Sequence, residues 1–212
     1  MTTPLYQKAR KHLSKVCPVM KQLITTVGPC TLTPNPADPF TLLVRSVIGQ
    51  QISSKAASSI FAKLASFVGG PPIPKAKLSK LTDAEFKACG VSAPKLRTLR
   101  AVVAHVEAHP ELLPGIEERD DDILRGQLTE IKGIGPWSVD MLLIFGFGRP
   151  DVLAVGDYGL LVALKNQFAL EKLPKAAEAT ALAEKWKPYR SVAMWYLWRS
   201  LEKPKAAVRV AE

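Results

Sequence analysis

Apolar residues recur along most of the chain at intervals of three and four, the spacing of one face of an α-helix. Alternation of polar and apolar residues, which is typical of strands, is sparse, and no Asn-Gly or Asp-Gly pair marks a hairpin. The pattern therefore predicts an all-α protein. Helices are expected over residues 5–27, 76–80, 83–89, 93–108, 120–127, 157–167, 176–185 and 189–202.

Capping residues and glycines divide the rest of the pattern. Asp38 can cap a helix that begins with a proline. The apolar run over residues 40–67 breaks near Gly49 into two helices, and Ser53 or Ser54 can cap the second. A further apolar helix follows the Gly-Ile-Gly-Pro stretch in the second half of the chain.

The composition is that of an ordinary globular protein and excludes several classes. Of the 212 residues, 47% are hydrophobic and 23% are charged, which is unlike a disordered chain. No apolar run is long enough to span a membrane, and the N-terminus lacks the apolar core of a signal peptide, so we expect an intracellular protein. Cys17, Cys30 and Cys89 are too scattered for a disulfide framework, a zinc site or an iron–sulfur cluster.

The charge balance points to a polyanion as partner. The formal net charge is +10, and no acidic residue precedes Asp38 although five lysines and arginines do. Nucleic acid is the commonest partner of such a surface. A basic surface without a partner is the alternative that charge alone leaves open.

The stretch from Gly133 to Pro136 is the first candidate site. Glycine permits positive φ angles and a narrow turn, and Pro136 suits the first position of the following helix. Exposed amides at such a helix N-terminus can bind a DNA phosphate, and the turn carbonyls can face a monovalent cation. A plain turn between two helices is the alternative.

The wider context resembles a known family of DNA repair enzymes. "LTEIKGIGPWSVDMLLIF", residues 128–145, resembles the helix-hairpin-helix motif of the DNA glycosylase superfamily, and a Gly/Pro-rich loop with an aspartate follows it. "SVIGQQISSKAASSIFAKL", "DVLAVGDYGL" and "AEKWKPYRSVAMWYLWRS" resemble further motifs of the 3-methyladenine DNA glycosylase II (AlkA-like) branch. The four motifs occur in the family's order between Phe40 and Leu201.

The resemblance implies a fold of two helical lobes that flank a cleft, the HhH-GPD fold. It implies an N-terminal helix within residues 1–39 that packs on the C-terminal lobe, a middle lobe over 40–115, and a hairpin and catalytic lobe over 116–212. The implied partner is double-stranded DNA with damaged bases, bound by a monomer that requires no cofactor. A structural Na⁺ or K⁺ ion would be held by the backbone carbonyls of Thr129, Ile131 and Ile134.

Asp157 is the implied catalytic residue. A carboxylate at a helix N-terminus is favoured as the anion, and a fixed negative charge stabilises the oxocarbenium-like transition state at C1′ of deoxyribose. Asp157 can also act only as the N-cap of the next helix. Asp151 is the rival carboxylate and is expected to fix the loop, whereas Asp140 lies inside the second helix of the hairpin.

Trp137 stands where family members that also cut the strand have a lysine nucleophile. An indole cannot form a Schiff base, so the resemblance implies a monofunctional hydrolase. Lys132 precedes the turn and cannot substitute for that lysine.

Trp137 and Trp198 match aromatic positions of the family's base pocket. An alkylated purine is cationic, and an aromatic pocket favours a cation by roughly 0.5–2 kcal/mol. Met141 replaces an aromatic residue of the relatives and affects the shape of the pocket. The substrates expected are 3-methyladenine and 7-methylguanine; deaminated bases such as hypoxanthine and uracil are the alternative.

Gln51 matches the residue that fills the gap left by the flipped base, and an amide there can bond to the orphaned partner base. Gln50 is expected to order the turn or to contact the DNA backbone, together with Lys132, Gly133 and Gly135. A non-catalytic protein that keeps the hairpin only for binding DNA is the alternative from another functional class.

Overall fold

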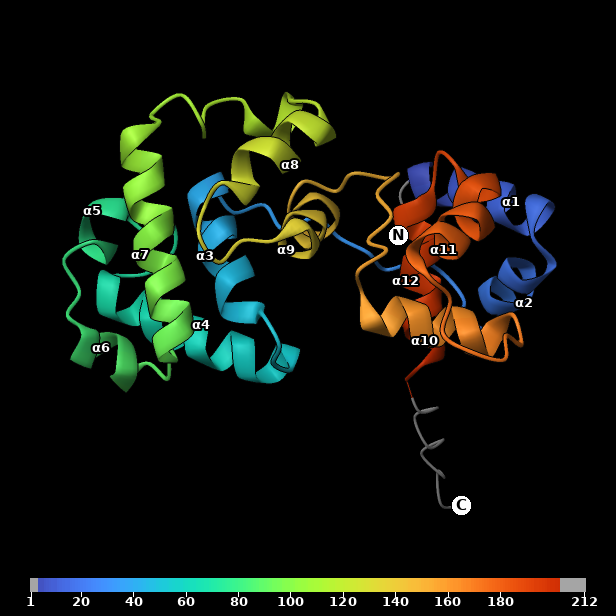
Figure 1. The fold of residues 1–212 in the computed structure, drawn as a ribbon, viewed down its shortest axis with the longest axis horizontal. Helices are drawn as coiled ribbons and strands as arrows, with labels where there is room; N and C mark the ends of the chain where they lie inside the picture. The colour runs from blue at the N-terminus through green and yellow to red at the C-terminus, as the bar shows by residue number, and fades with distance from the viewer. Residues whose placement is uncertain (1–3, 203–212) are drawn as a thin grey trace, which may run out of the picture. The chain divides into compact units, whose positions relative to one another are not determined.

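The chain folds into helices over the part that the computed structural model describes, residues 4–202, and this part contains no β-strand (Figure 1). The predicted all-α class is thereby confirmed. The helices belong to two compact units. One combines the chain up to Leu32 with the residues from Pro150 on, and the other runs from Thr33 to Arg149.

The first unit contains five α-helices. They are α1 (Pro4–Val16), α2 (Pro18–Val27), α10 (Tyr158–Gln167), α11 (Ala176–Ala183), which continues into a 3-10 turn at Glu184–Trp186, and α12 (Arg190–Ser200). The second unit contains the others. They are α3 (Pro39–Gly49), α4 (Ser54–Val68), α5 (Lys75–Leu78), α6 (Asp83–Ala88), α7 (Ala93–Ala108), a 3-10 turn at Ile116–Glu118, α8 (Asp121–Thr129), α9 (Pro136–Met141) and a π-helical segment at Leu142–Gly146.

Helix α12 is the centre of the first unit. Every residue from 191 to 197 is buried, and α1, α2 and α10 pack against this helix. A helix that is buried on all sides needs neighbours on all sides. The O–H of Tyr196 donates to the carbonyl of Gly28 at 2.9 Å and so joins α12 to the end of α2.

Helix α3 has the corresponding place in the second unit. Leu43, Val44, Val47 and Ile48 are at most 1% exposed, and helices α4, α7 and α9 and the segment Leu142–Gly146 pack against α3. The hairpin is therefore fastened to the same core as the helices that precede it.

One helix differs from the sequence prediction. The expected helix over 5–27 is two helices, because Pro18 forces Cys17 into an extended conformation with φ −147° and ψ 113°. In the observed division, α1 and α2 group with α10, α11 and α12, and residues 116–149 group with residues 33–115, where α9 packs on α3.

Side-chain caps begin two helices where the sequence predicted them. The carboxylate of Asp38 accepts a hydrogen bond from the N–H of Thr41 at 3.0 Å, with the proline in the first turn. The hydroxyl of Ser53 accepts from the N–H of Ala56 at 3.3 Å. Each cap satisfies one of the amides that have no partner inside the helix.

The Asp38 cap gives a direct test of this account. Asp38→Ala is expected to lower the free energy of unfolding by about 1 kcal/mol, because the amide of Thr41 loses its acceptor. Asp38→Asn keeps an acceptor oxygen and should stay close to wild type. Urea unfolding measures both, and equal losses in the two variants would contradict the capping role.

Candidate active site and DNA-binding hairpin

The hairpin turn between α8 and α9 is built around Gly133. This residue has φ +95°, and a Cβ there would lie 2.1 Å from the hydroxyl oxygen of Thr98. Only glycine permits both the backbone angle and the close approach to α7. Gly135 has φ −102° and open space around it, and Pro136 begins α9 as predicted.

Gln50 ties the end of α3 to this turn. Its amide nitrogen donates to the carbonyl of Gly133 and to the hydroxyl of Ser138, both at 3.0 Å. The side chain is half-buried, so it is not a solvated surface glutamine. Lys95 donates a hydrogen bond to the carbonyl of Ile48 at 2.6 Å, near the C-terminus of α3. Burial lowers the pKa of this lysine.

Gln51 has a different environment from its neighbour. Its side chain is exposed, and its φ of +57° lies in the left-handed region that non-glycine residues seldom adopt. The turn between α3 and α4 thus presents Gln51 outward, while Gln50 holds the turn against the hairpin. Strain of this kind is found at functional positions, which makes Gln51 a candidate contact residue.

An ion pair joins the two helices of the hairpin. The Nε of Arg125 on α8 donates to the carboxylate of Asp140 on α9 at 3.0 Å, and another guanidinium nitrogen contacts Asp122 at 2.7 Å. Burial raises the pKa of Asp140, and the hydrogen bond from Arg125 opposes that effect. Burial by itself would lower the pKa of Arg125, but the bond to Asp140 raises it overall. Asp140 therefore fixes the hairpin.

Trp137 and Met141 lie one helical turn apart on α9, and both are half-buried. Immediately after Met141 the helix widens into the π segment Leu142–Gly146, where the N–H of Phe147 donates to the carbonyl of Leu142 at 3.0 Å. Such π segments are rare and occur often at functional sites. From the sequence, this segment was expected only to continue an apolar helix.

Asp157 is held by two hydrogen bonds at the start of α10. It is the N-cap residue, and its Oδ1 accepts from the N–H of Leu160 at 2.7 Å. The same oxygen accepts from the indole N–H of Trp198 at 2.8 Å. A Cβ on Gly159 would lie 3.1 Å from this oxygen and 3.6 Å from the Trp198 ring, so the glycine leaves room for the pair. The carboxylate is half-buried and fixed in place.

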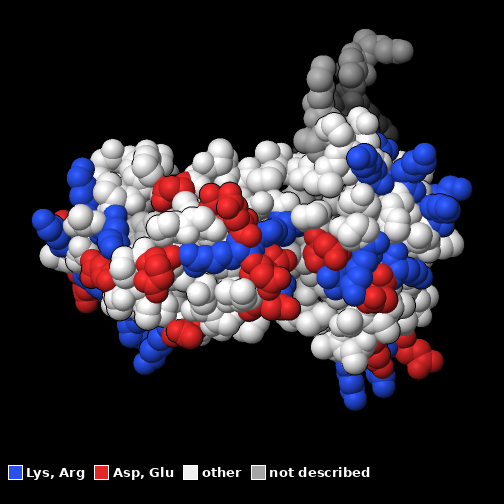
Figure 2. Space-filling model, turned by 90° about the horizontal axis from the view of Figure 1, so that it is seen from above, with Lys and Arg blue, Asp and Glu red and all other residues white. Residues whose placement is uncertain are grey.

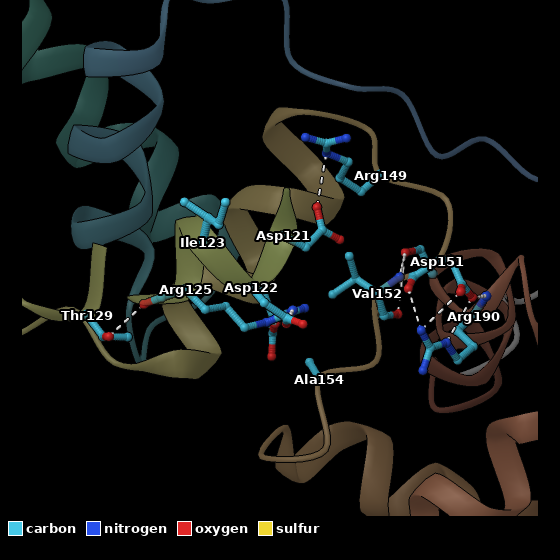
Figure 3. Close-up of polar contacts among 12 residues, drawn as sticks. Asp121, Asp122, Ile123, Arg125, Thr129, Arg149, Asp151, Val152, Ala154 and Arg190 are labelled. Carbon is cyan, nitrogen blue, oxygen red and sulfur yellow. Dashed lines mark hydrogen bonds and ion pairs between the residues drawn. The ribbon is translucent and has the colours of Figure 1, made fainter. Parts of the chain in front are cut away.

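Asp151, the rival carboxylate, is committed to an ion pair. Its Oδ1 accepts from Nε of Arg190 at 2.8 Å and its Oδ2 accepts from a terminal nitrogen of Arg190 at 3.0 Å (Figure 3). Bidentate pairs of this kind are strong and specific in geometry. Asp140 and Asp151 each form an ion pair with an arginine. Asp157 instead accepts hydrogen bonds from an indole N–H and from a backbone N–H at a helix N-terminus.

The predicted site residues fall into two groups, one in each unit. Asp157 and Trp198 contact each other in the first unit, and Gln50 contacts the hairpin turn in the second. Sequence reasoning missed the roles of Gly159, Arg190 and Thr98. Arg190 lies inside a motif quoted for the family resemblance, but only the structure identifies its partner.

The net charge of +10 is not concentrated on the face seen in Figure 2, where acidic side chains lie among the basic ones. Lys132 is exposed in the hairpin turn. Within residues 4–202, no three His, Cys, Asp or Glu side chains gather as metal ligands, and no helix is long and apolar enough to cross a membrane.

These features define the class of the protein. The family model of the HhH-GPD superfamily base excision DNA repair proteins matches residues 44–188, which include the hairpin, Asp157 and the 3-10 turn before α12. The chain belongs to this family. The predicted resemblance is thereby confirmed.

Particular relatives are similar over nearly the whole chain. The alkylbase DNA glycosidase-like protein mag2 of Schizosaccharomyces pombe is 34% identical, over 92% of this chain and 93% of that protein. DNA-3-methyladenine glycosylase 1 of the same organism is 34% identical, over 91% of this chain and 86% of that protein. The structure of the S. pombe 3-methyladenine DNA glycosylase Mag1 in complex with abasic DNA matches with a TM-score of 0.80 and 32% identity, over 91% of this chain and 96% of that one.

Gly133 and Gly135 form a matched pair for testing the hairpin. Gly133→Ala is expected to lower the free energy of unfolding by about 2–4 kcal/mol, because the new Cβ meets Thr98 at a strained φ. Gly135→Ala should change stability by less than about 1 kcal/mol, since its φ suits any residue. Thermal unfolding measures both. Similar losses in the two variants would show that close packing on α7 does not determine the turn.

Proposed function

We propose that the protein is a monofunctional DNA glycosylase that removes alkylated purines, of the 3-methyladenine and 7-methylguanine type, from double-stranded DNA. The observation that carries the proposal is the placement of Asp157. In a member of this repair family, a carboxylate is held at a helix N-terminus by the N–H groups of Leu160 and Trp198. Relatives that cover most of the chain are named as 3-methyladenine or alkylbase enzymes.

The proposed reaction is hydrolysis of the N-glycosidic bond. The bond from C1′ to the base nitrogen breaks, and the base leaves with the electron pair. An alkylated purine is already cationic, so it leaves as a neutral molecule. Asp157 stabilises the positive charge that develops on the sugar, and water adds its oxygen to C1′ while its proton passes to solvent or to a base. An abasic site and the free base result.

The second unit supplies the contacts to the DNA duplex. The turn from Lys132 to Gly135 offers a positive charge and a helix N-terminus to a phosphate. Gln51, exposed on a strained turn, enters the stack in place of the flipped base. The bond from Gln50 to Gly133 keeps these two contacts in a constant relation within that unit. The target is DNA inside the cell.

Trp137 and Met141 select the base in this proposal. An indole face and a polarisable thioether on one side of α9 favour a cationic, flat lesion over a neutral one. Trp198 adds aromatic surface beside Asp157. Trp137 also stands at the position of the lysine in strand-cutting relatives, so no Schiff base forms and the strand stays intact. Lys132 is exposed and precedes the turn, so it does not replace that lysine.

A monovalent cation suits the hairpin turn. Thr129 is the last residue of α8, where helix carbonyls lack intrahelical partners, and Ile131 and Ile134 follow in the turn. The carbonyl of Ile131 accepts from the N–H of Ile134 at 2.9 Å and keeps a second lone pair. Oxygen ligands of this kind fit Na⁺ or K⁺, which would bridge the turn to a phosphate.

The proposed chemistry predicts a specific loss in Asp157→Asn. The rate of base release under single-turnover conditions is expected to fall by about 100- to 1,000-fold, because the negative charge that faces the sugar is lost. The substrates are duplexes with one 7-methylguanine, 3-methyladenine or hypoxanthine. Wild type should favour the two cationic lesions.

Other outcomes identify the alternatives. Equal base release by wild type and Asp157→Asn would refute the catalytic assignment of Asp157. Release of hypoxanthine but not of methylated bases would favour the enzyme for deaminated bases. Tight binding of DNA without release of any base from the panel would favour a protein that only binds DNA.

Trp198→Phe separates the hydrogen bond from the aromatic ring. A hydrogen bond to a charged group contributes about 1.5–3 kcal/mol, so its loss is expected to slow base release by about 10- to 100-fold while a ring remains. Tyr196→Phe is the control, since it removes one hydrogen bond between α12 and Gly28 and touches neither Asp157 nor its partners. A rate close to wild type in Trp198→Phe would show that the indole N–H does not position the carboxylate.

A further inference from the structure

The loop that carries Asp157 is held along helix α12 from its first residues to its last. The carbonyl of Pro150 accepts from the N–H of Ser191 at 3.0 Å, and the N–H of Val152 donates to the Ser191 hydroxyl at 2.9 Å. The N–H of Ala154 donates to the sulfur of Met194 at 3.3 Å. The indole of Trp198 then reaches Asp157 at the end of the loop. The loop and the helix therefore run in the same direction.

The helical partners in this series form one stripe of α12. Positions 190, 191, 194 and 198 fall within about 100° of one another around a helix of 3.6 residues per turn. From the first to the last they span about 12 Å along the axis. Residues 192, 193 and 195–197 of the helix are buried, and α1, α2 and α10 pack against it, so the stripe is held in place.

Arg190 and Asp151 make the most extensive contact of the series. Besides the two bonds between guanidinium and carboxylate, the backbone N–H of Arg190 donates to Oδ1 of Asp151 at 3.1 Å. A terminal nitrogen of Arg190 also donates to the backbone carbonyl of Asp151 at 2.9 Å. The side chains are 21% and 28% exposed, so water screens them only in part. Together the four bonds fix both the side chain and the backbone at the start of the loop (Figure 3).

We propose that Arg190 and Asp151 are a positioning pair for Asp157: they set the register of the catalytic loop on α12, and thereby the place of the carboxylate relative to the sugar. The inference rests on the proposed function of Asp157. Asp157 is only six positions after Asp151, and the N–H of Asp157 donates to the carbonyl of Ala154 at 2.9 Å. A shift at the start of the loop is therefore passed through Ala154 to Asp157.

The pair acts on placement and not on reactivity. Asp157 accepts its hydrogen bonds from Leu160 and Trp198, and Leu160 lies on the helix that the loop leads into. Without the pair between Arg190 and Asp151, the start of the loop is no longer fixed on α12, and the N-terminus of α10 is positioned less firmly. A displacement of the order of 1 Å at a reacting group costs about 100-fold in rate.

The test compares two abasic analogues in duplex DNA, a neutral tetrahydrofuran and a pyrrolidine that is a cation at pH 7. Both occupy the place of the sugar, and only the second gains from a carboxylate that faces it. The ratio of the two dissociation constants thus reports the position of Asp157, independently of how much protein is folded. Asp157→Asn should abolish the preference for the cation. Arg190→Gln and Asp151→Asn should each reduce it about 10-fold, with binding of the neutral analogue nearly unchanged.

Controls separate positioning from a general loss of stability. Arg190→Lys retains the charge without the planar fork and should give an intermediate ratio. Lys187→Gln removes one positive charge just before α12 by breaking an exposed pair with Glu184, and should leave the ratio at the wild-type value.

Two results would overturn the proposal, and they differ from each other. If Asp157→Asn loses the preference for the cationic analogue while Arg190→Gln and Asp151→Asn keep it, the pair between Arg190 and Asp151 only stabilises the fold. This holds even when those two variants melt at a lower temperature. If Asp157→Asn keeps the preference, Asp157 does not face the sugar, and both the catalytic assignment and this inference fail.

Discussion

The first unit depends on one packing constraint, the burial of helix α12 on every side. Residues 191–197 carry almost no polar face, so the helix is stable only when other segments cover it. Helices α1 and α2, from the opposite end of the chain, provide part of that cover, and the bond between Tyr196 and Gly28 fixes their join. A fold that brings both chain ends to one helix gives that helix little freedom to move. Because α12 is held on all sides, it can serve as a rigid support for the loop that ends in Asp157.

In the second unit, the constraint is a tight turn that must keep its shape while it stays exposed at the surface. Three contacts hold the turn. Thr98 occupies the space that a side chain on Gly133 would need, and Gln50 donates a hydrogen bond to the carbonyl of Gly133. Arg125 on α8 forms an ion pair with Asp140 on α9. Each involves a polar group that is satisfied within the unit. The turn can therefore face a partner while its own backbone is already fixed.

Local signals in the sequence were sufficient for most of the helices. Periodicity and caps predicted most helices, including the cap at Asp38 and the break at Gly49, because those signals act within a few residues. The break at Pro18 was missed although proline was visible, since the apolar pattern continues through it. The π segment after Met141 ends at Gly146, where a Cβ would lie 3.3 Å from Leu42 of α3, and no local pattern indicates this tertiary approach.

Pairings over long distances could not be predicted, because no local pattern encodes them. Arg190 and Asp151 are 39 positions apart, and Gln50 and Gly133 are 83 apart. The family resemblance named Asp157 and Trp198 as site residues, yet it assigned the indole to the base pocket only. Its hydrogen bond to the carboxylate gives it a second role that depends on the register of α12. The assignment of residues 116–149 to a lobe likewise required the contact between α9 and α3.

The proposed reaction explains why so many of these residues act by position. A cationic purine is a good leaving group, so the enzyme needs neither a covalent nucleophile nor an acid to protonate the base. What the transition state lacks is a nearby negative charge, and its benefit falls steeply when the charge is misplaced. Trp137 in place of a lysine and an Asp157 fixed by two N–H groups both fit a site that works by placement. For such a site, the bonds that locate the carboxylate are as much a part of catalysis as the carboxylate itself.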